Sequence, residues 1–245
     1  MEESLTVLYT YGLRGDLDGL PRLYTFIRQL TAFYRNDGVT VCQHDPAPPL
    51  GRLLLLDLGD SCAPESWHCA VTGGRSMIVA LDGMGYHAAN VSGFFAPESR
   101  AKLSESTQIK LIDADHPVDL DGILLSLIPP SLTQPPTRPD PFSHTREWRY
   151  TDVGMPDGAS GDPLPLTILM HPAEQTRLDG NTLQLARPES TQVGAAQVIP
   201  LLGAWKLTHT QIHPLPARIQ PDPTIAGVVD FVMGEARYRQ KRDQA

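Results

Sequence analysis

The chain has 245 residues, a length that allows one large domain or two small ones. Hydrophobic residues make up 41% of it, enough for a sizeable core, and a formal net charge of −8 argues against nucleic acid or an anionic membrane as its main partner. No stretch approaches the roughly 18 apolar residues of a transmembrane helix. Three cysteines make no disulfide framework and no signal peptide is evident, so we expect a cytoplasmic location.

The first part of the chain is predicted to alternate strands and helices. Leu5–Thr10 is rich in β-formers, and Leu20–Tyr34 repeats apolar residues at helical spacing. The four consecutive leucines that open Leu53–Asp60 predict a strand that is buried on both faces. A helix within 72–85 and a strand within 86–93 follow. Together they predict a βαβ unit, whose chemistry is expected at the carboxyl ends of its strands.

The second part of the chain is predicted to be mainly strands. Three are expected at Thr107–Asp113, Gly122–Ile128 and Leu164–Met170, the last ending at His171. Three more are expected to form an antiparallel set, at Asn181–Ala186, Ala195–Leu202 and Trp205–Ile212. A helix over 223–240 closes the chain, with Asp222 as its N-cap and Pro223 at its first position.

Residues 129–141 form a proline-rich excursion, with six prolines in 13 positions. Proline lacks a backbone N–H group, so this stretch is predicted to be an extended or exposed loop rather than a helix or a central strand. It is long for a connection, and Phe142 and Trp148 follow it. We therefore expect residues 129–150 to contact another protein chain; the alternative is a long loop that packs on its own domain.

Two motifs carry a resemblance to a known family. Gly59-Asp60 ends the leucine-rich strand, and Gly85-Tyr86 ends the following helix. In this arrangement the chain resembles the 5′-nucleotidase branch of the calcineurin-like metallophosphoesterases. The resemblance implies an α/β fold, a two-sheet β-sandwich flanked by helices, as a single degenerate domain over residues 1–245.

The resemblance also implies a two-metal centre, but most of its ligands are absent here. Aligned on the family's motifs, four ligand positions hold residues of other types: Gly12, Arg14, Gly93 and Phe94. Leu127 replaces a further metal-binding histidine. Asp60 and His171 remain as candidate ligands, and two ligands do not hold a cation that takes four to six. Arg14 could pair with Asp60 in place of the metal; the alternative places Arg14 on a solvated loop.

The loop beside Asp60 holds three further candidates, Cys62, His68 and Cys69. Two cysteines and a histidine could bind zinc, but the standard C-x-x-C spacing is absent. The alternative is a pair of buried thiols without a metal. The sequence contains neither a phosphate-binding P-loop motif nor a nucleophile-elbow motif.

These observations favour a catalytically inactive metallophosphoesterase-like domain, a pseudoenzyme with no cofactor and no catalytic residues. It would act as a binding or scaffold subunit whose partner is another protein chain. One alternative is a metal-dependent phosphohydrolase with a rebuilt site that uses Asp60, His171 and the Cys62–Cys69 loop. The other is a small-ligand binder that uses the vacated cleft. The sequence leaves the oligomeric state open.

Overall fold

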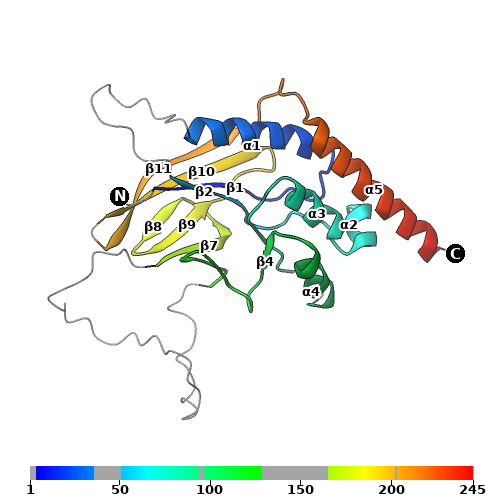
Figure 1. Cartoon of the computed structure of the whole chain (residues 1–245), viewed down its shortest axis with the longest axis horizontal. Helices are drawn as coiled ribbons and strands as arrows, with labels where there is room; N and C mark the ends of the chain where they lie inside the picture. The colour runs from blue at the N-terminus through cyan, green and yellow to red at the C-terminus, as the bar shows by residue number, and fades with distance from the viewer. Residues whose placement is uncertain (1–3, 36–50, 94–96, 129–164, 202, 245) are drawn as a thin grey trace, which may run out of the picture.

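The structure is a computed structural model that describes residues 4–35, 51–93, 97–128, 165–201 and 203–244. Two sheets and a group of helices make up the fold (Figure 1). The helices are α1 (Leu20–Arg35), α2 (Trp67–Thr72), α3 (Arg75–Gly83), α4 (Pro97–Ser106) and α5 (Pro223–Asp243). The strands are β1 (Leu5–Thr10), β2 (Arg52–Asp57), β3 (Ala88–Asn90), β4 (Lys110–Ile112), β5 (Val118–Leu120), β6 (Ile123–Ser126), β7 (Leu166–Ala173), β8 (Arg177–Asp179), β9 (Thr182–Ala186), β10 (Gln192–Leu201) and β11 (Ala204–Pro214).

The first sheet has six strands in the order β11-β10-β1-β2-β3-β4. Strands β1 to β4 run parallel to one another, whereas β10 pairs antiparallel with β1. The leucines of β2 are buried on both faces of this sheet, as the uninterrupted apolar run predicts. Leu54 and Leu56 face the second sheet, and Leu55 faces the helices.

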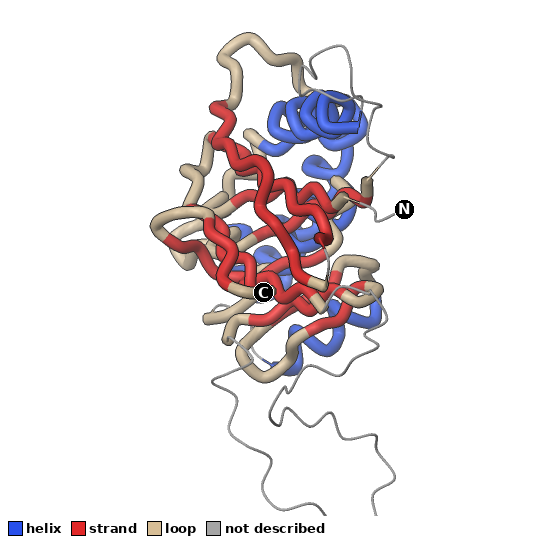
Figure 2. Tube along the Cα trace, turned by 90° about the vertical axis from the view of Figure 1, so that its left-hand side faces the viewer, coloured by secondary structure: helices blue, strands red, loops and turns tan. Residues whose placement is uncertain are grey.

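The second sheet has five strands in the order β5-β6-β7-β9-β8. It stacks on the first sheet, and a core of alternating inward side chains fills the space between them, including Tyr9, Leu56 and Met170. Figure 2 shows the helices along one side of the stacked strands. The mixed α/β sandwich of two sheets flanked by helices confirms the predicted fold class.

The helices cover the outer face of the six-stranded sheet. The apolar side of α1, with Leu23 and Ile27, packs there together with α3 and α5. Helix α5 begins where the sequence predicts, because the Asp222 carboxylate accepts hydrogen bonds from the backbone N–H groups of Thr224 and Ile225. It extends to Asp243, beyond the predicted end at residue 240. No described helix is long and apolar enough to cross a membrane.

Three predicted features of the chain are wrong. The predicted antiparallel set is divided, because β10 and β11 pair in the first sheet while β9 pairs parallel with β7 in the second. Strand β7 continues through His171 to Ala173 instead of ending at His171, with a register shift beyond Ile168. Part of the predicted loop after Asp60 is helix α2. Each correction depends on pairing or packing with distant segments, which local patterns do not specify.

Several predicted features lie outside the described residues. They include the proline-rich stretch 129–141, the proposed contact segment 129–150 and the aligned ligand position Phe94. The described part of the chain still contains both loops that follow β1 and β2, and these loops form the centre of the candidate site.

Candidate functional site

The candidate site lies at the carboxyl ends of β1 and β2, where two loops run side by side. The backbone N–H groups of Gly12, Arg14 and Gly15 donate hydrogen bonds to the carbonyl oxygens of Gly59, Asp60 and Ser61, at 2.9, 3.0 and 2.8 Å respectively. This register fixes the loop after β1 directly against the loop after β2. The sequence signal for both loops is the glycine content that follows each apolar strand.

The register brings the Arg14 and Asp60 side chains together. Arg14 Nη1 lies 3.4 Å from Asp60 Oδ2, and Arg14 Nη2 also donates to the Glu65 carboxylate. The Glu65 hydrogen bond, followed by the charge of Asp60, raises the pKa of Arg14. Of the two alternatives that the sequence left open for Arg14, the structure shows the pair with Asp60, and the Arg14 side chain is at the same time 57% exposed, as on a solvated loop. Glu65 is a third member of the ion cluster that the sequence reasoning missed.

Both members of this pair have an unusual backbone conformation. Arg14 has a φ of 50° and Asp60 a φ of 55°, in the left-handed region that residues other than glycine seldom adopt. Such a conformation costs free energy, and the surrounding structure has to impose it. Here the paired loop backbones hold both residues in place.

A pocket of about 510 Å³ opens beside Asp60, between the loops that follow β2 and β3. Its lining combines polar groups with the apolar surface of α3. The lining residues are Tyr11, Asp57, Leu58, Gly59, Asp60, Ser61, Cys62, Pro64, Met77, Ile78, Asn90, Val91, Ser92, Gly93 and Pro172. The pocket is within the size range of small-molecule sites.

Asp57, the last residue of β2, is a buried carboxyl at the base of this region. Its side chain is fully buried, and its Oδ1 accepts a hydrogen bond of 3.3 Å from Thr10 Oγ1, which lies 3.0 Å from the hydroxyl of Tyr86. Its Oδ2 has no partner at hydrogen-bonding geometry among the described residues, although Ser61 lies near. Burial raises the pKa of Asp57 to about 7. Sequence reasoning missed Asp57, whose signal is a charge inside an apolar strand.

Asn90, at the end of β3, ties three segments of the site together. Its Nδ2 donates to the carbonyl oxygens of Leu58, at 3.0 Å, and Met170, at 2.7 Å. Its Oδ1 accepts a hydrogen bond of 2.9 Å from the backbone N–H of Ser92. Both Nδ2 hydrogens and an Oδ1 lone pair are thus used inside the fold, so Asn90 holds the pocket wall in place. The sequence reasoning also missed this residue.

Cys62, in the loop that follows Asp60, and Cys69, in α2, bring two thiols close together. Cys62 Sγ and Cys69 Sγ are 2.7 Å apart, and both side chains are buried. The hydrogen bond from Cys62 lowers the pKa of Cys69 and raises that of Cys62. The two sulfur atoms pair with each other, which agrees with the buried-thiol alternative rather than with a zinc site.

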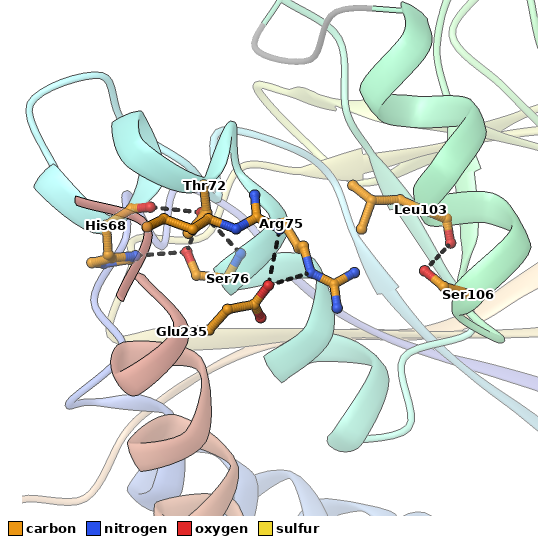
Figure 3. A network of polar contacts seen from close by, with 8 residues as sticks. His68, Thr72, Arg75, Ser76, Leu103, Ser106 and Glu235 are labelled. Atoms are coloured by element: carbon orange, nitrogen blue, oxygen red, sulfur yellow. Dashed lines mark hydrogen bonds and ion pairs between the residues drawn. The ribbon is translucent and has the colours of Figure 1, made fainter. Parts of the chain in front are cut away.

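His68 is used inside the fold by both of its ring nitrogens. Its Nε2 lies 2.9 Å from the carbonyl oxygen of Gly15 and therefore carries the hydrogen, because a carbonyl only accepts. Its Nδ1 lies 2.7 Å from the Ser76 hydroxyl (Figure 3). His68 thus connects the loop after β1 to α3 and is no free metal ligand. A neighbouring contact in the same view joins α3 to α5, where Arg75 Nε donates to Glu235 at 3.1 Å.

The remaining sequence candidates do not gather around Asp60. His171 lies in β7 and is not among the residues that line the pocket, although its neighbour Pro172 is. Leu127 packs against the core between the sheets. Among the described residues, no group of three or more His, Cys, Asp or Glu side chains is placed to hold a metal ion. The donor set near Asp60 therefore does not fit the two-metal centre that the resemblance implies.

Comparisons with known proteins agree with this fold and add no closer assignment. No protein-family model matches the sequence, and no curated protein matches it. A search of solved structures finds the calcineurin-like phosphoesterase YfkN from Bacillus subtilis, with a TM-score of 0.51 and 10% sequence identity. The match covers 98% of this chain and 100% of that one. At this identity the similarity shows the calcineurin-like phosphoesterase fold alone.

Proposed function

We propose that this chain is a catalytically inactive domain of the metallophosphoesterase-like type, which acts as a binding or scaffold subunit for another protein chain. The observation that carries the proposal is the ion pair between Arg14 and Asp60. It occupies the carboxyl ends of β1 and β2, where the 5′-nucleotidase resemblance would place metal ligands. The degenerate state of the site and the 5′-nucleotidase-like subtype are both part of this proposal.

The chemistry of the pair argues against a two-metal mechanism. Two-metal phosphoester hydrolysis uses cations about 3.5–4 Å apart, held by a shared set of oxygen and nitrogen ligands. A guanidinium keeps its positive charge throughout the pH range of proteins, so a divalent cation bound to Asp60 Oδ2 would meet a like charge at Arg14. Gly12 and Gly93 have no side-chain ligand to offer. Arg14 thus supplies internally the positive charge that Asp60 requires.

Metal content and turnover test the inactive state together. The full chain is incubated with Mn²⁺, Zn²⁺ or Fe²⁺ and then separated from unbound ions by gel filtration. Elemental mass spectrometry measures its metal content, and nitrophenyl phosphate mono- and diesters measure its hydrolytic activity. We expect less than about one equivalent of metal and no metal-dependent hydrolysis. Two equivalents together with turnover that is lost in Asp60→Asn would overturn the proposal and favour a rebuilt phosphohydrolase site.

The scaffold role is tested separately, because an inactive domain need not bind a protein. Tagged full chain is isolated from its native host under mild conditions and compared with a chain that lacks residues 130–139, within the predicted contact segment. We expect a stoichiometric partner with the intact chain and a weaker yield with the deletion, at nearly equal melting temperatures. If no protein accompanies the intact chain above an unrelated tagged control, the scaffold role is wrong.

The pocket beside Asp60 supports a second candidate function, binding of a small ligand. Its volume of about 510 Å³ and its mixture of carboxylate, amide, hydroxyl and apolar groups are typical of small-molecule sites. Thermal-shift measurements with a panel of amines, nucleosides and sugar phosphates would identify a ligand class. Ile78→Trp, on the apolar wall, should abolish any shift by filling the pocket, whereas Phe33→Ala on the distant face of α1 should leave it unchanged.

A further inference from the structure

The outward face of α5 carries two exposed aromatic side chains. Phe231 is 63% exposed and Tyr238 is 69% exposed, and both exceed the other exposed large hydrophobic residues of the described chain. Gly227 and Gly234 are exposed on the same helix. The order Gly227, Phe231, Gly234, Tyr238 alternates steps of four and three residues. This spacing forms one continuous stripe along a helix, which we call the α5 stripe.

The α5 stripe faces away from the rest of the fold. The buried residues of α5 are Ile225, Val229, Val232 and Ala236, and the first three belong to the core that α5 shares with the other helices. Successive residues of a helix are rotated by about 100° around its axis, so the α5 stripe lies roughly on the side of the helix opposite to the buried residues. Figure 1 shows the carboxyl-terminal half of α5 reaching beyond the other helices. A partner can therefore approach the stripe without meeting the body of the domain.

The fold itself gives no reason for the two glycines. A Cβ atom added at Gly227 or Gly234 would meet nothing within 4 Å. Glycine in a helix interior is less stable than alanine, because it loses more backbone freedom when the helix forms. Two glycines in the solvent face of a long helix are explained if another surface approaches the helix backbone there.

We propose that the α5 stripe is a self-association surface, on which the α5 helix of a second copy of this chain docks in antiparallel orientation. In a two-fold pair centred between Val232 and Met233, residues at equal distances on either side of the centre meet across the interface. Phe231 and Gly234 are such a pair, and so are Gly227 and Tyr238. Each aromatic side chain then fits over a glycine of the other copy, and the stripe is complementary to itself.

Charged residues beside the stripe favour the same partner and orientation. Asp230 and Arg237 each precede an aromatic residue of the stripe by one position, so both flank it on the same side. In the antiparallel pair, Asp230 of one copy lies beside Arg237 of the other, and the contact occurs twice. Within the described chain, neither side chain takes part in an ion pair. Both charges are thus available to a second copy.

A single helix pair buries less surface than the roughly 1,600 Å² of a standard interface, so we expect a dissociation constant in the micromolar range. The inference is independent of the proposed function, because the α5 stripe shares no residue with the pocket or with the Arg14–Asp60 pair. A monomeric protein could still be catalytically inactive, and a dimer could still bind metal. One proposal can therefore be contradicted by its test while the other stands.

Sedimentation velocity over about 1–200 µM full chain measures the association. We expect the mass to rise from monomer to dimer with concentration, and Phe231→Ala with Tyr238→Ala to weaken dimerisation at least about tenfold. Phe33→Ala removes an exposed aromatic side chain from α1 and serves as the matched control, with unchanged association. A wild-type chain that remains monomeric throughout this range would overturn the inference.

Two further variants separate a specific helix pair from general stickiness. Gly234→Leu should raise the melting temperature of the monomer through better helix propensity and yet weaken dimerisation, because its side chain fills the space for Phe231 of the other copy. Asp230→Arg and Arg237→Asp should each weaken the homodimer, and an equimolar mixture of the two should associate again. If Gly234→Leu dimerises like wild type, or if the charge variants fail to complement each other, the antiparallel α5 pair is wrong.

Discussion

The Arg14 guanidinium lies 3.4 Å from the Asp60 carboxylate, across two loops that three backbone hydrogen bonds hold in register. Each residue has a positive φ, so the contact depends on a backbone that neither residue would adopt by itself. The pair therefore reflects the tertiary structure of both loops. Its consequences for stability can be measured one substitution at a time.

Arg14→Ala is expected to lower the melting temperature by about 1–2 °C, because it removes an exposed ion pair while it keeps the strained backbone. The difference from wild type should shrink between about 0.1 M and about 1 M salt, as screening weakens the pair. Arg14→Gly loses the same charge but fits the positive φ, so it should be less destabilising than Arg14→Ala. Calorimetry at both salt concentrations checks the order, and equal melting temperatures for wild type and Arg14→Ala would contradict the pairing.

Asp57 should make the protein less stable as the pH rises from about 4 to about 7. The folded protein keeps the Asp57 proton up to a pKa of about 7, whereas the unfolded chain releases it near 3.8, so the folded state binds more protons across this window. Above pH 7 the Asp57 carboxyl is ionised in both the folded and the unfolded state, and the loss of stability levels off at about 4 kcal/mol.

Asp57→Asn should remove this penalty. The variant should be more stable than wild type at pH 8 and close to it at pH 4, as measured by urea unfolding across the range. Asp179→Asn replaces an exposed carboxylate on β8 and provides the control, with the wild-type pH profile. A variant curve that runs parallel to wild type from pH 4 to pH 8 would contradict the buried carboxyl.

Asn90→Ala is expected to lower the free energy of unfolding by about 1–3 kcal/mol, because the carbonyl oxygens of Leu58 and Met170 lose their donor. Asn90→Asp should cost at least as much at neutral pH, since a carboxylate cannot donate to either carbonyl. Ser92→Ala changes an exposed neighbour whose backbone N–H still bonds Asn90, and it should be neutral. Chemical denaturation of the three variants gives the comparison; a stable Asn90→Asp protein would show that the amide is not a donor here.

Cys62 and Cys69 should form an intramolecular disulfide when the protein is treated with oxidised glutathione. The two thiols lose two hydrogens to one molecule of oxidised glutathione, which is released as two molecules of reduced glutathione, so the intact mass of the protein falls by about 2 Da. The starting contact of 2.7 Å between the sulfur atoms requires little movement. Peptide mass spectrometry should locate the bond, Cys62→Ser should prevent it and Cys42→Ser should not. Stable glutathione adducts in place of the disulfide would contradict the predicted pair.

The sequence by itself determined the elements whose signals are local. The leucine run of β2 has too few polar groups for a solvated strand, and the apolar spacing of α1 fits one face of a helix. Asp222 and Pro223 mark the start of α5 because capping requires only neighbouring residues. The sequence alone also shows that Gly12 and Arg14 offer no metal ligand, since glycine has no side chain and a guanidinium does not bind cations.

Only the tertiary structure decided which of these elements meet. The sequence predicted β9, β10 and β11 as one set, but the pairing of β9 with β7 depends on segments far apart in the chain. Glu65 joins Arg14 across two loops, and Asn90 of β3 joins Leu58 to Met170 of β7; no local pattern encodes either contact. The buried state of Asp57 likewise follows from packing above β2, because burial is a property of the assembled core rather than of one residue's neighbours in sequence.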